Sequence, residues 1–139
     1  MEFLRNPTLR LKLLLWAIAL HSMMVMVGLT LHPAGFMEIA GYRPLSEPFF
    51  AAQGGIFHLI MALAYSMAAM DLVRHRCLIT FAILVKGIAT LFLFSYWIFV
   101  SHIPAVLASG FVDGAMALIL WAAYISWSRH TTMEARLDG

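Results

Sequence analysis

The sequence predicts an all-α integral membrane protein, in which four helices form an up-down bundle with the N and C termini in the cytoplasm. Three observations predict this fold class. Of the 139 residues, 63% are hydrophobic and only 12% are charged, whereas about a quarter of the residues of a soluble domain are charged. Four apolar runs have the length of a membrane span, and the Lys and Arg residues gather in alternate connections.

The four predicted spans run from about residue 11 to 31, 50 to 70, 78 to 100 and 104 to 127. A helix needs about 20 apolar residues to cross the hydrocarbon core. The runs are too long and too continuous for barrel strands, so helices must satisfy their backbone groups. The first run is too long for the apolar part of a signal peptide. We therefore expect a retained helix and a single transmembrane domain over residues 1–139.

The orientation follows from the positive charges outside the spans. Seven Lys or Arg residues flank the chain ends or the turn between spans two and three, while one lies in the first loop. The seven are Arg5, Arg10, Lys12, Arg74, Arg76, Arg129 and Arg136, and the one is Arg43. This bias places both termini and the middle turn in the cytoplasm. No clustered basic stripe is present, so we expect no nucleic-acid partner.

The connections predict how the spans are arranged. Residues 71–76 and 101–104 form short turns, which make neighbouring helices antiparallel. The first loop, residues 32–49, mixes Pro and Gly with apolar side chains. That composition favours an ordered loop on the outer surface with a short interfacial segment.

Each span carries one ionisable residue well inside the hydrocarbon region: His21, His58, Lys86 and Asp113. Counting residues from the span ends places all four roughly 12–18 Å from the cytoplasmic face, in one layer near the midplane. Lone charges at this depth are costly, so we expect Lys86 and Asp113 to pair. This layer is the candidate site, with Tyr65, about two helical turns beyond His58, as a fifth member.

Small residues near the four ionisable groups predict which helix faces point inward. The predicted inward stripes combine each ionisable group with neighbours on its own span. They are Ala17, His21, Met24 and Gly28; Gly54, His58, Ala62, Tyr65 and Ala69; Ala82, Lys86, Gly87, Ala89 and Thr90; and Ser109, Gly110, Asp113, Gly114 and Ala117.

Several readings of the layer stay open. Lys86 and Asp113 form either a structural ion pair or part of a proton or substrate site. His21 and His58 are either hydrogen-bonded core residues or ligands of a haem. A quinone site lies between these readings, because quinone carbonyls need one or two donors in an apolar pocket, and His58, Tyr65 or Lys86 supplies them. No spacing typical of a metal site is present, and the one cysteine, Cys77, excludes an internal disulfide.

The stretch from Gln53 to Tyr124 resembles the DoxX-like family of small four-helix bacterial membrane proteins. The resemblance rests on Gln53-Gly54-Gly55 at the head of a helix that ends at Asp71, a short basic turn, Lys86-Gly87, and Asp113-Gly114. Leu72 stands where the family often has Pro. The resemblance implies a bacterial inner membrane, and the wider family includes a membrane subunit of a thiosulfate:quinone oxidoreductase.

Three functions fit these observations. The first is a non-catalytic integral subunit or accessory protein of a larger membrane complex, in bacterial energy metabolism, whose apolar helix faces contact lipid and other subunits. The second is a quinone-interacting redox protein with His21, His58, Tyr65, Lys86 and Asp113 around a midplane pocket. The third is a small transporter or proton conductor, which we place last because no span contains a broken helix.

Overall fold

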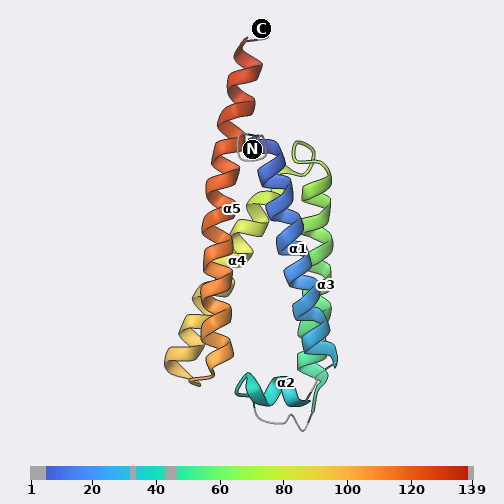
Figure 1. Cartoon of the computed structure of the whole chain (residues 1–139), viewed down its shortest axis with the longest axis vertical. Coiled ribbons are helices and arrows are strands. Elements are labelled where there is room, and N and C mark those ends of the chain that lie inside the picture. The colour runs from blue at the N-terminus through green and yellow to red at the C-terminus, as the bar shows by residue number, and fades with distance from the viewer. Residues whose placement is uncertain (1–5, 32–33, 43–46, 138–139) are drawn as a thin grey trace.

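The computed structural model of the chain describes residues 6–31, 34–42 and 47–137, with the side chains of residues 34, 36 and 134–137 left aside. In this part of the chain all regular structure is helical: α1 (Pro7–Leu31), α2 (Ala34–Ile39), α3 (Phe49–Met70), α4 (Arg76–Phe99) and α5 (Pro104–Leu137). Figure 1 shows four long helices and the short α2. The long four are each apolar enough to cross a membrane, which confirms the predicted spans. Arg5 and Arg43, which enter the charge count, lie outside the described residues.

Two helices are longer than predicted. The side-chain oxygen of Asn6 accepts the backbone N–H of Leu9 at 3.1 Å, and Pro7 occupies the first helical position. Asn followed by Pro is a common helix start, so α1 begins four residues before the apolar run. At the other end of the chain, α5 continues past residue 127 to Leu137. Residues 128–137 are too polar for a span, and they extend the helix beyond it.

Hydrogen bonds between a side chain and the backbone fix the turn between α3 and α4. The carboxylate of Asp71 accepts the N–H groups of Val73 and Arg74 at 3.1 and 3.0 Å, which folds the turn between α3 and α4. The hydrogen bond from Arg74, and less strongly that from Val73, hold the pKa of Asp71 below its usual value.

Helix α2 confirms the short segment expected in the first loop, and it ends in a tight turn at Gly41. The backbone φ of Gly41 is 86°, a left-handed conformation that favours glycine. Its N–H and that of Tyr42 close the helix on the carbonyls of Glu38 and Met37, both at 2.9 Å. A Cβ at Gly41 would lie 3.0 Å from the ring of Pro104, so this turn rests on the start of α5.

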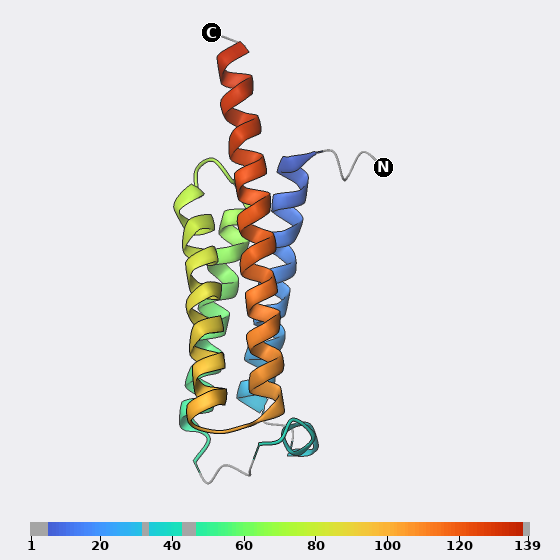
Figure 2. The same cartoon turned by 90° about the vertical axis from the view of Figure 1, so that its left-hand side faces the viewer.

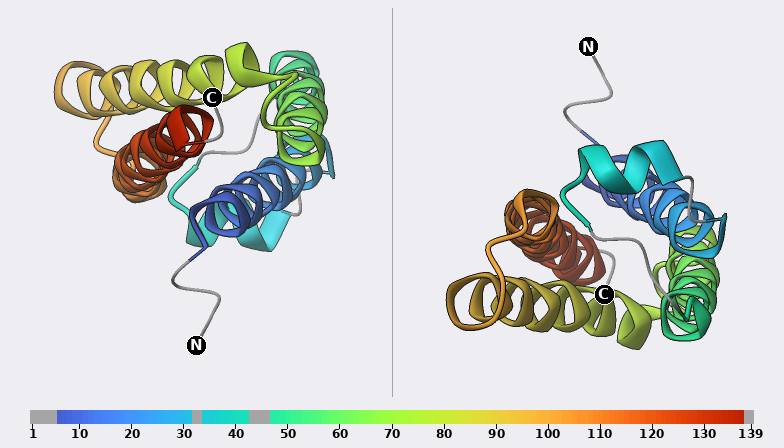
Figure 3. Two further views of the ribbon diagram at one scale, coloured as in Figure 1. Left: turned by 90° about the horizontal axis from the view of Figure 1, so that it is seen from above. Right: turned by 90° about the horizontal axis from the view of Figure 1, so that it is seen from below.

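The four long helices form two pairs. Helix α1 packs mainly on α3, and α4 packs mainly on α5, as the views from above and below show (Figure 3). Glycines allow close approach inside each pair. A Cβ at Gly55 would overlap the hydroxyl of Thr30 and would lie 3.0 Å from the carbonyl oxygen of Met26. In the other pair, Gly110 faces the ring of Phe94 at 3.0 Å.

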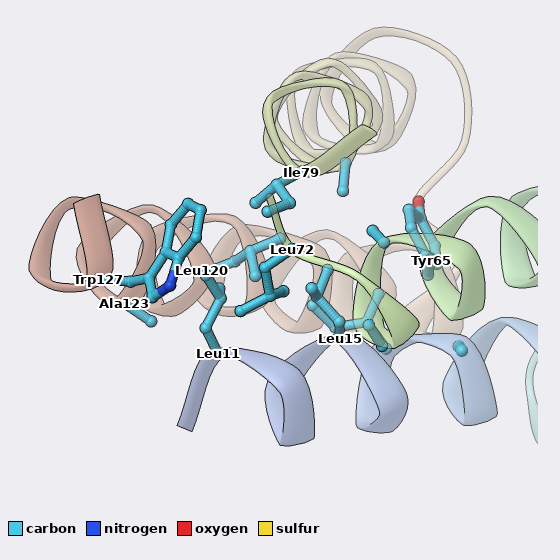
Figure 4. Packing of buried hydrophobic residues seen from close by; sticks show 13 residues of the cluster. Leu11, Leu15, Tyr65, Leu72, Ile79, Leu120, Ala123 and Trp127 are labelled. Atoms are coloured by element: carbon cyan, nitrogen blue, oxygen red, sulfur yellow. The ribbon is translucent and has the colours of Figure 1, made fainter. Parts of the chain in front are cut away.

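The hydrophobic core joins the two pairs at one end only (Figure 4). On α1 its members precede His21, on α3 they follow His58, on α4 they precede Lys86, and on α5 they follow Asp113. The members are Leu11, Leu15, Ile18, Ala19, Tyr65, Ala68, Ala69, Leu72, Ile79, Ala82, Leu120, Ala123 and Trp127. The whole core therefore lies between the ionisable layer and the turn at residues 71–75.

On the other side of the layer the packing is sparse. Among the described residues beyond the layer on that side, only Gly55, Val106 and Gly110 are buried. Gly55 and Gly110 are covered by the partner helix of their own pair. In Figure 1 the ribbons of the two pairs move apart toward α2, so the pairs are joined near the 71–75 turn and separate toward α2.

Candidate functional site

The predicted ion pair between α4 and α5 is present. Lys86 Nζ donates a hydrogen bond to Asp113 Oδ1 at 2.5 Å, and the two residues are only 3% and 7% exposed. Around them, Gly114 leaves room for the side chain of Thr90, whose methyl group would lie 3.2 Å from a Cβ there. Thr90 Oγ1 in turn donates to the carbonyl oxygen of Lys86 at 2.7 Å. The close packing of α4 on α5 thus holds both charged groups at one level, and their pairing offsets part of the cost of burial.

The two histidines lie beside this ion pair, although they belong to the other pair of helices. His21 on α1 and His58 on α3 are both close enough to Lys86 and Asp113 to interact with their charges, and they also interact with each other. The four ionisable residues that residue counting placed in one layer therefore do share one region.

Three buried polar atoms in this layer have no hydrogen-bond partner among the described residues: His21 Nδ1, His58 Nδ1 and Ser22 Oγ. Ser22 is only 1% exposed. An unpaired polar group in an apolar interior costs about 1–3 kcal/mol. Most buried polar groups are paired for this reason. These three atoms are therefore unsatisfied in this part of the structure, and a hydrogen-bonding ligand or water that reached them would offset the cost.

Tyr65 borders the layer on its packed side. It is 1% exposed and interacts electrostatically with Asp113. Figure 4 shows its hydroxyl directed away from the leucines of α1. Its ring belongs to the hydrophobic core, so Tyr65 forms the boundary between that core and the charged groups.

The predicted inward face is correct for α3 but partly wrong for α1, α4 and α5; on α4, Gly87 lines a groove on the surface of the helix pair and has no atom within 4 Å of its Cβ position. On α1, Ala17 and Met24 are exposed, and the buried stripe is instead Leu11, Leu15, Ile18, Ala19 and Ser22. On α5, Ser109 is exposed. Small residues allow a helix to approach a neighbour, but they do not tell a neighbouring helix from lipid. Ser22, which sequence reasoning missed, follows Leu15 and Ile18 at helical spacing, and that spacing could have identified it.

The geometry of α1 and α3 does not favour a haem between His21 and His58. Gly55, one turn from His58, lies so near α1 that a Cβ on it would come within 3.0 Å of the carbonyl oxygen of Met26. A porphyrin inserted between these two helices would have to separate them at that contact.

A second group of interacting side chains lies at the end of the bundle that the positive charges predict to be cytoplasmic. Its central residue is Arg76, which the sequence analysis counted only as a positive charge. Arg76, at the start of α4, donates to Tyr124 Oη at 2.8 Å and to Ser128 Oγ at 2.6 Å. Its guanidinium also stacks over the rings of Tyr124 and Trp127. This contact fastens α4 to α5 beside the core.

The outer surface of α4 and α5 carries an apolar groove of about 620 Å³. It is lined by Ile83, Leu84, Gly87, Ile88, Thr90, Leu91, Gly114, Ala117, Leu118 and Trp121. Most of its large side chains are more than half exposed. The groove therefore faces the surroundings of the molecule rather than the space between the helix pairs.

The side chains of this layer are suited to binding a ligand or moving a proton. It offers an ion pair, two imidazoles and a hydroxyl in apolar surroundings, which are groups that bind a polar head or move a proton. Within the described ranges no three His, Cys, Asp or Glu residues converge on a point where a metal ion could be held. A comparison of the chain with protein-family models, with curated proteins and with solved structures finds no match in any of the three.

Proposed function

We propose that the chain is a multi-pass membrane protein that binds a quinone-type molecule at the layer formed by His21, Ser22, His58, Lys86 and Asp113. One observation carries the proposal: His21 Nδ1, Ser22 Oγ and His58 Nδ1 are buried without a partner among the described residues, in the layer that contains the Lys86–Asp113 ion pair. A lipid-soluble ligand with oxygen atoms would satisfy them. This observation moves quinone binding ahead of the accessory role that the sequence alone favours.

The chemistry of the layer suits both redox forms of such a ligand. The Nδ1 atom of a neutral histidine is a donor in one tautomer and an acceptor in the other. It can therefore donate to a quinone carbonyl or accept from a quinol hydroxyl. Lys86 bonds only Asp113 among the described residues, and an ammonium group has further N–H donors to offer.

Replacement of His58 by Ala tests this function. Purified chain in nanodiscs is titrated with a long-tailed benzoquinone, and the dissociation constant is expressed per mole of lipid. We expect His58→Ala to weaken binding about tenfold, the effect of one lost hydrogen bond in a dry site. His75→Ala, in the turn outside the layer, is the matched control. Equal binding by wild type and His58→Ala would refute the site, and no binding by wild type would refute the function.

A role as an accessory subunit remains the second candidate, and helix α5 favours it. Arg76 is the first residue of α4, and it contacts Ser128 on α5. Residues 129–137 of α5 therefore extend past that end of α4 (Figure 2). An isolated helix of this length is marginal in water, and a partner subunit would stabilise it. The tagged chain should migrate with a large assembly after gentle detergent extraction, and a chain that ends at residue 130 should not. Migration of both as the same small particle would argue against a partner.

The arrangement in the membrane is part of the proposal. We infer an up-down bundle with both termini on the cytoplasmic side of a bacterial inner membrane, supported by the positive charges and by the resemblance to the DoxX-like family. Cys77 is exposed in the described structure near the 71–75 turn. A membrane-impermeant maleimide should label Cys77 in inside-out vesicles and not in intact cells. Glu38→Cys, in α2, should show the opposite pattern once Cys77 is replaced by Ser.

A further inference from the structure

The apolar groove of about 620 Å³ between α4 and α5 lies within the segments that are apolar enough to cross a membrane. Gly87 and Gly114 line it without a side chain of their own, and no atom lies within 4 Å of the Cβ position of Gly87. Five large side chains that also line it are more than half exposed: Leu84, Ile88, Leu91, Leu118 and Trp121. The groove is therefore an open apolar hollow, which suits a hydrocarbon chain.

Two exposed arginines lie beyond one end of this groove. Arg76 precedes Ile83, which lines the groove, by seven residues. Arg129 follows Leu118 by eleven residues, and both spacings return to nearly the same face of a helix. Seven residues of helix rise by about 10 Å, so Arg76 lies about that far beyond the groove. Past its other end, residues 92–112 contain no Lys, Arg, Asp or Glu, so the groove has positive charge at one end only.

The polar groups around these arginines suit an anion. Arg76 donates to Tyr124 and Ser128, which uses two of the five N–H donors of a guanidinium. A second hollow, of about 360 Å³, is lined by Ser128, Arg129, Thr132 and Met133. Among the side chains that the structure describes, no carboxylate pairs with Arg76 or Arg129. Because guanidinium groups bind phosphate through charge-assisted hydrogen bonds, a phosphate would supply the counter-charge.

We propose that the groove and the two arginines form one binding site for an anionic phospholipid of the leaflet around the 71–75 turn. The phosphate lies at Arg76 and Arg129, and an acyl chain runs along the groove toward Leu91. Basic groups at the ends of membrane helices bind anionic head groups through the same charges. This inference goes beyond the proposed function and does not depend on quinone binding at the layer.

Charge favours a lipid over a second copy of the chain as the occupant of the groove. Two copies with the same orientation in the membrane, paired through this face, would be related by a twofold axis along the membrane normal. Arg76 and Arg129 of both copies would then lie at one level, and like charges at short distance repel. An anionic lipid instead brings the opposite charge to the same place.

Native mass spectrometry of the full chain in detergent tests the head site. The probes are phosphatidylglycerol and phosphatidylcholine with the same dioleoyl chains. We expect phosphatidylglycerol to bind about twentyfold more tightly, because each arginine contributes about fivefold. Arg129→Gln should lose about fivefold, and Arg129→Lys should retain most of the binding. Arg10→Gln removes an exposed arginine from α1, and this matched control should bind like wild type. Equal binding of the two lipids, or an equal loss in Arg10→Gln, would overturn the site.

Two glycines test the tail site. Gly87→Leu places a side chain in the groove, whereas Gly28→Leu places one on α1 outside it, and neither glycine has an atom within 4 Å of its Cβ position. We expect Gly87→Leu to weaken binding of dioleoyl phosphatidylglycerol about tenfold and Gly28→Leu to bind like wild type. Thermal melting verifies that both variants are folded. If Arg129→Gln weakens binding and Gly87→Leu does not, the acyl chain does not lie in the groove and the proposal is wrong.

A cross-linking experiment tests the competing occupant. With Cys77 replaced by Ser, Gly87→Cys places the sole thiol of the chain in the groove. In liposomes of phosphatidylglycerol and phosphatidylcholine, oxidation should give no disulfide-linked dimer, because lipid covers the groove. A dimer in high yield would show that a second copy covers this face, and it would overturn the proposal.

Discussion

At the scale of single residues, the layer combines one satisfied contact with three unsatisfied ones. Lys86 and Asp113 neutralise each other at 2.5 Å, and this pair alone would serve as a structural element that sets the register of α4 against α5. His21, Ser22 and His58 gain nothing from it in hydrogen bonds. The pair and the unpaired atoms therefore have separable roles, one in stability and the other in binding.

Mutation of the ion pair should separate these roles. Asp113→Asn leaves the ammonium of Lys86 buried without a counter-charge, and such a loss costs about 3–5 kcal/mol. The double variant Lys86→Met with Asp113→Leu removes both charges and should regain most of the stability. Unfolding in mixed micelles by SDS measures both. A single variant as stable as wild type would show that the pair contributes little, and quinone titration of the double variant reports whether the charges also bind.

At the scale of helices, the sequence predicted where the spans lie better than which way they face. Hydropathy located the four long helices to within a few residues at most ends, and it missed the start of α1 only because Asn6 and Pro7 are a capping signal rather than an apolar one. It also ended the last span at residue 127, where polarity rises but the helix continues. Because a helix rises by a constant amount per residue, counting placed His21, His58, Lys86 and Asp113 in one layer.

Helix faces could not be predicted equally well, because lipid and protein are both apolar. Ala17 and Met24 on α1 resemble packing residues and yet are exposed. Only the positions of the neighbouring helices decide that Leu15, Ile18 and Ser22 are buried instead. The unpaired state of the histidines was also beyond the sequence, since it depends on which side chains fail to reach them.

The glycines that separate the helices of a pair should differ sharply in their tolerance of a methyl group. Gly55→Ala forces a Cβ against Thr30 and the carbonyl oxygen of Met26, so it should destabilise the chain by about 1–3 kcal/mol. Gly87→Ala meets nothing within 4 Å, and it should be neutral or slightly stabilising because alanine favours helix. Thermal melting of both variants in one detergent makes the comparison. Equal melting temperatures would contradict the close approach of α1 and α3.

At the scale of the whole molecule, packing is concentrated at one end. The core cluster, the Arg76 contact and the 71–75 turn all lie on the same side of the ionisable layer. At the opposite end, Gly41 after α2 lies close to Pro104, and the described residues there form no core that joins the two pairs. Local stability should therefore decrease from one end of each long helix to the other.

Amide hydrogen exchange should report this gradient. In nanodiscs, residues 117–127 of α5 should exchange more slowly than residues 104–112 of the same helix, because only the former pack into the core that joins the pairs. Uniform exchange along α5 without ligand would contradict the one-sided packing.

The one-sided packing also makes the molecule sensitive to the bilayer around it. Two helix pairs that are joined at one end and separate at the other have a cross-section that is larger in one leaflet than in the other. The lateral pressure of the chains in that leaflet then acts on the distance between the pairs. Lipids that crowd the leaflet on the α2 side would press the pairs together, and lipids that relieve the crowding would let them spread. The composition of a single leaflet would thereby set how readily the layer at His21 and His58 is reached.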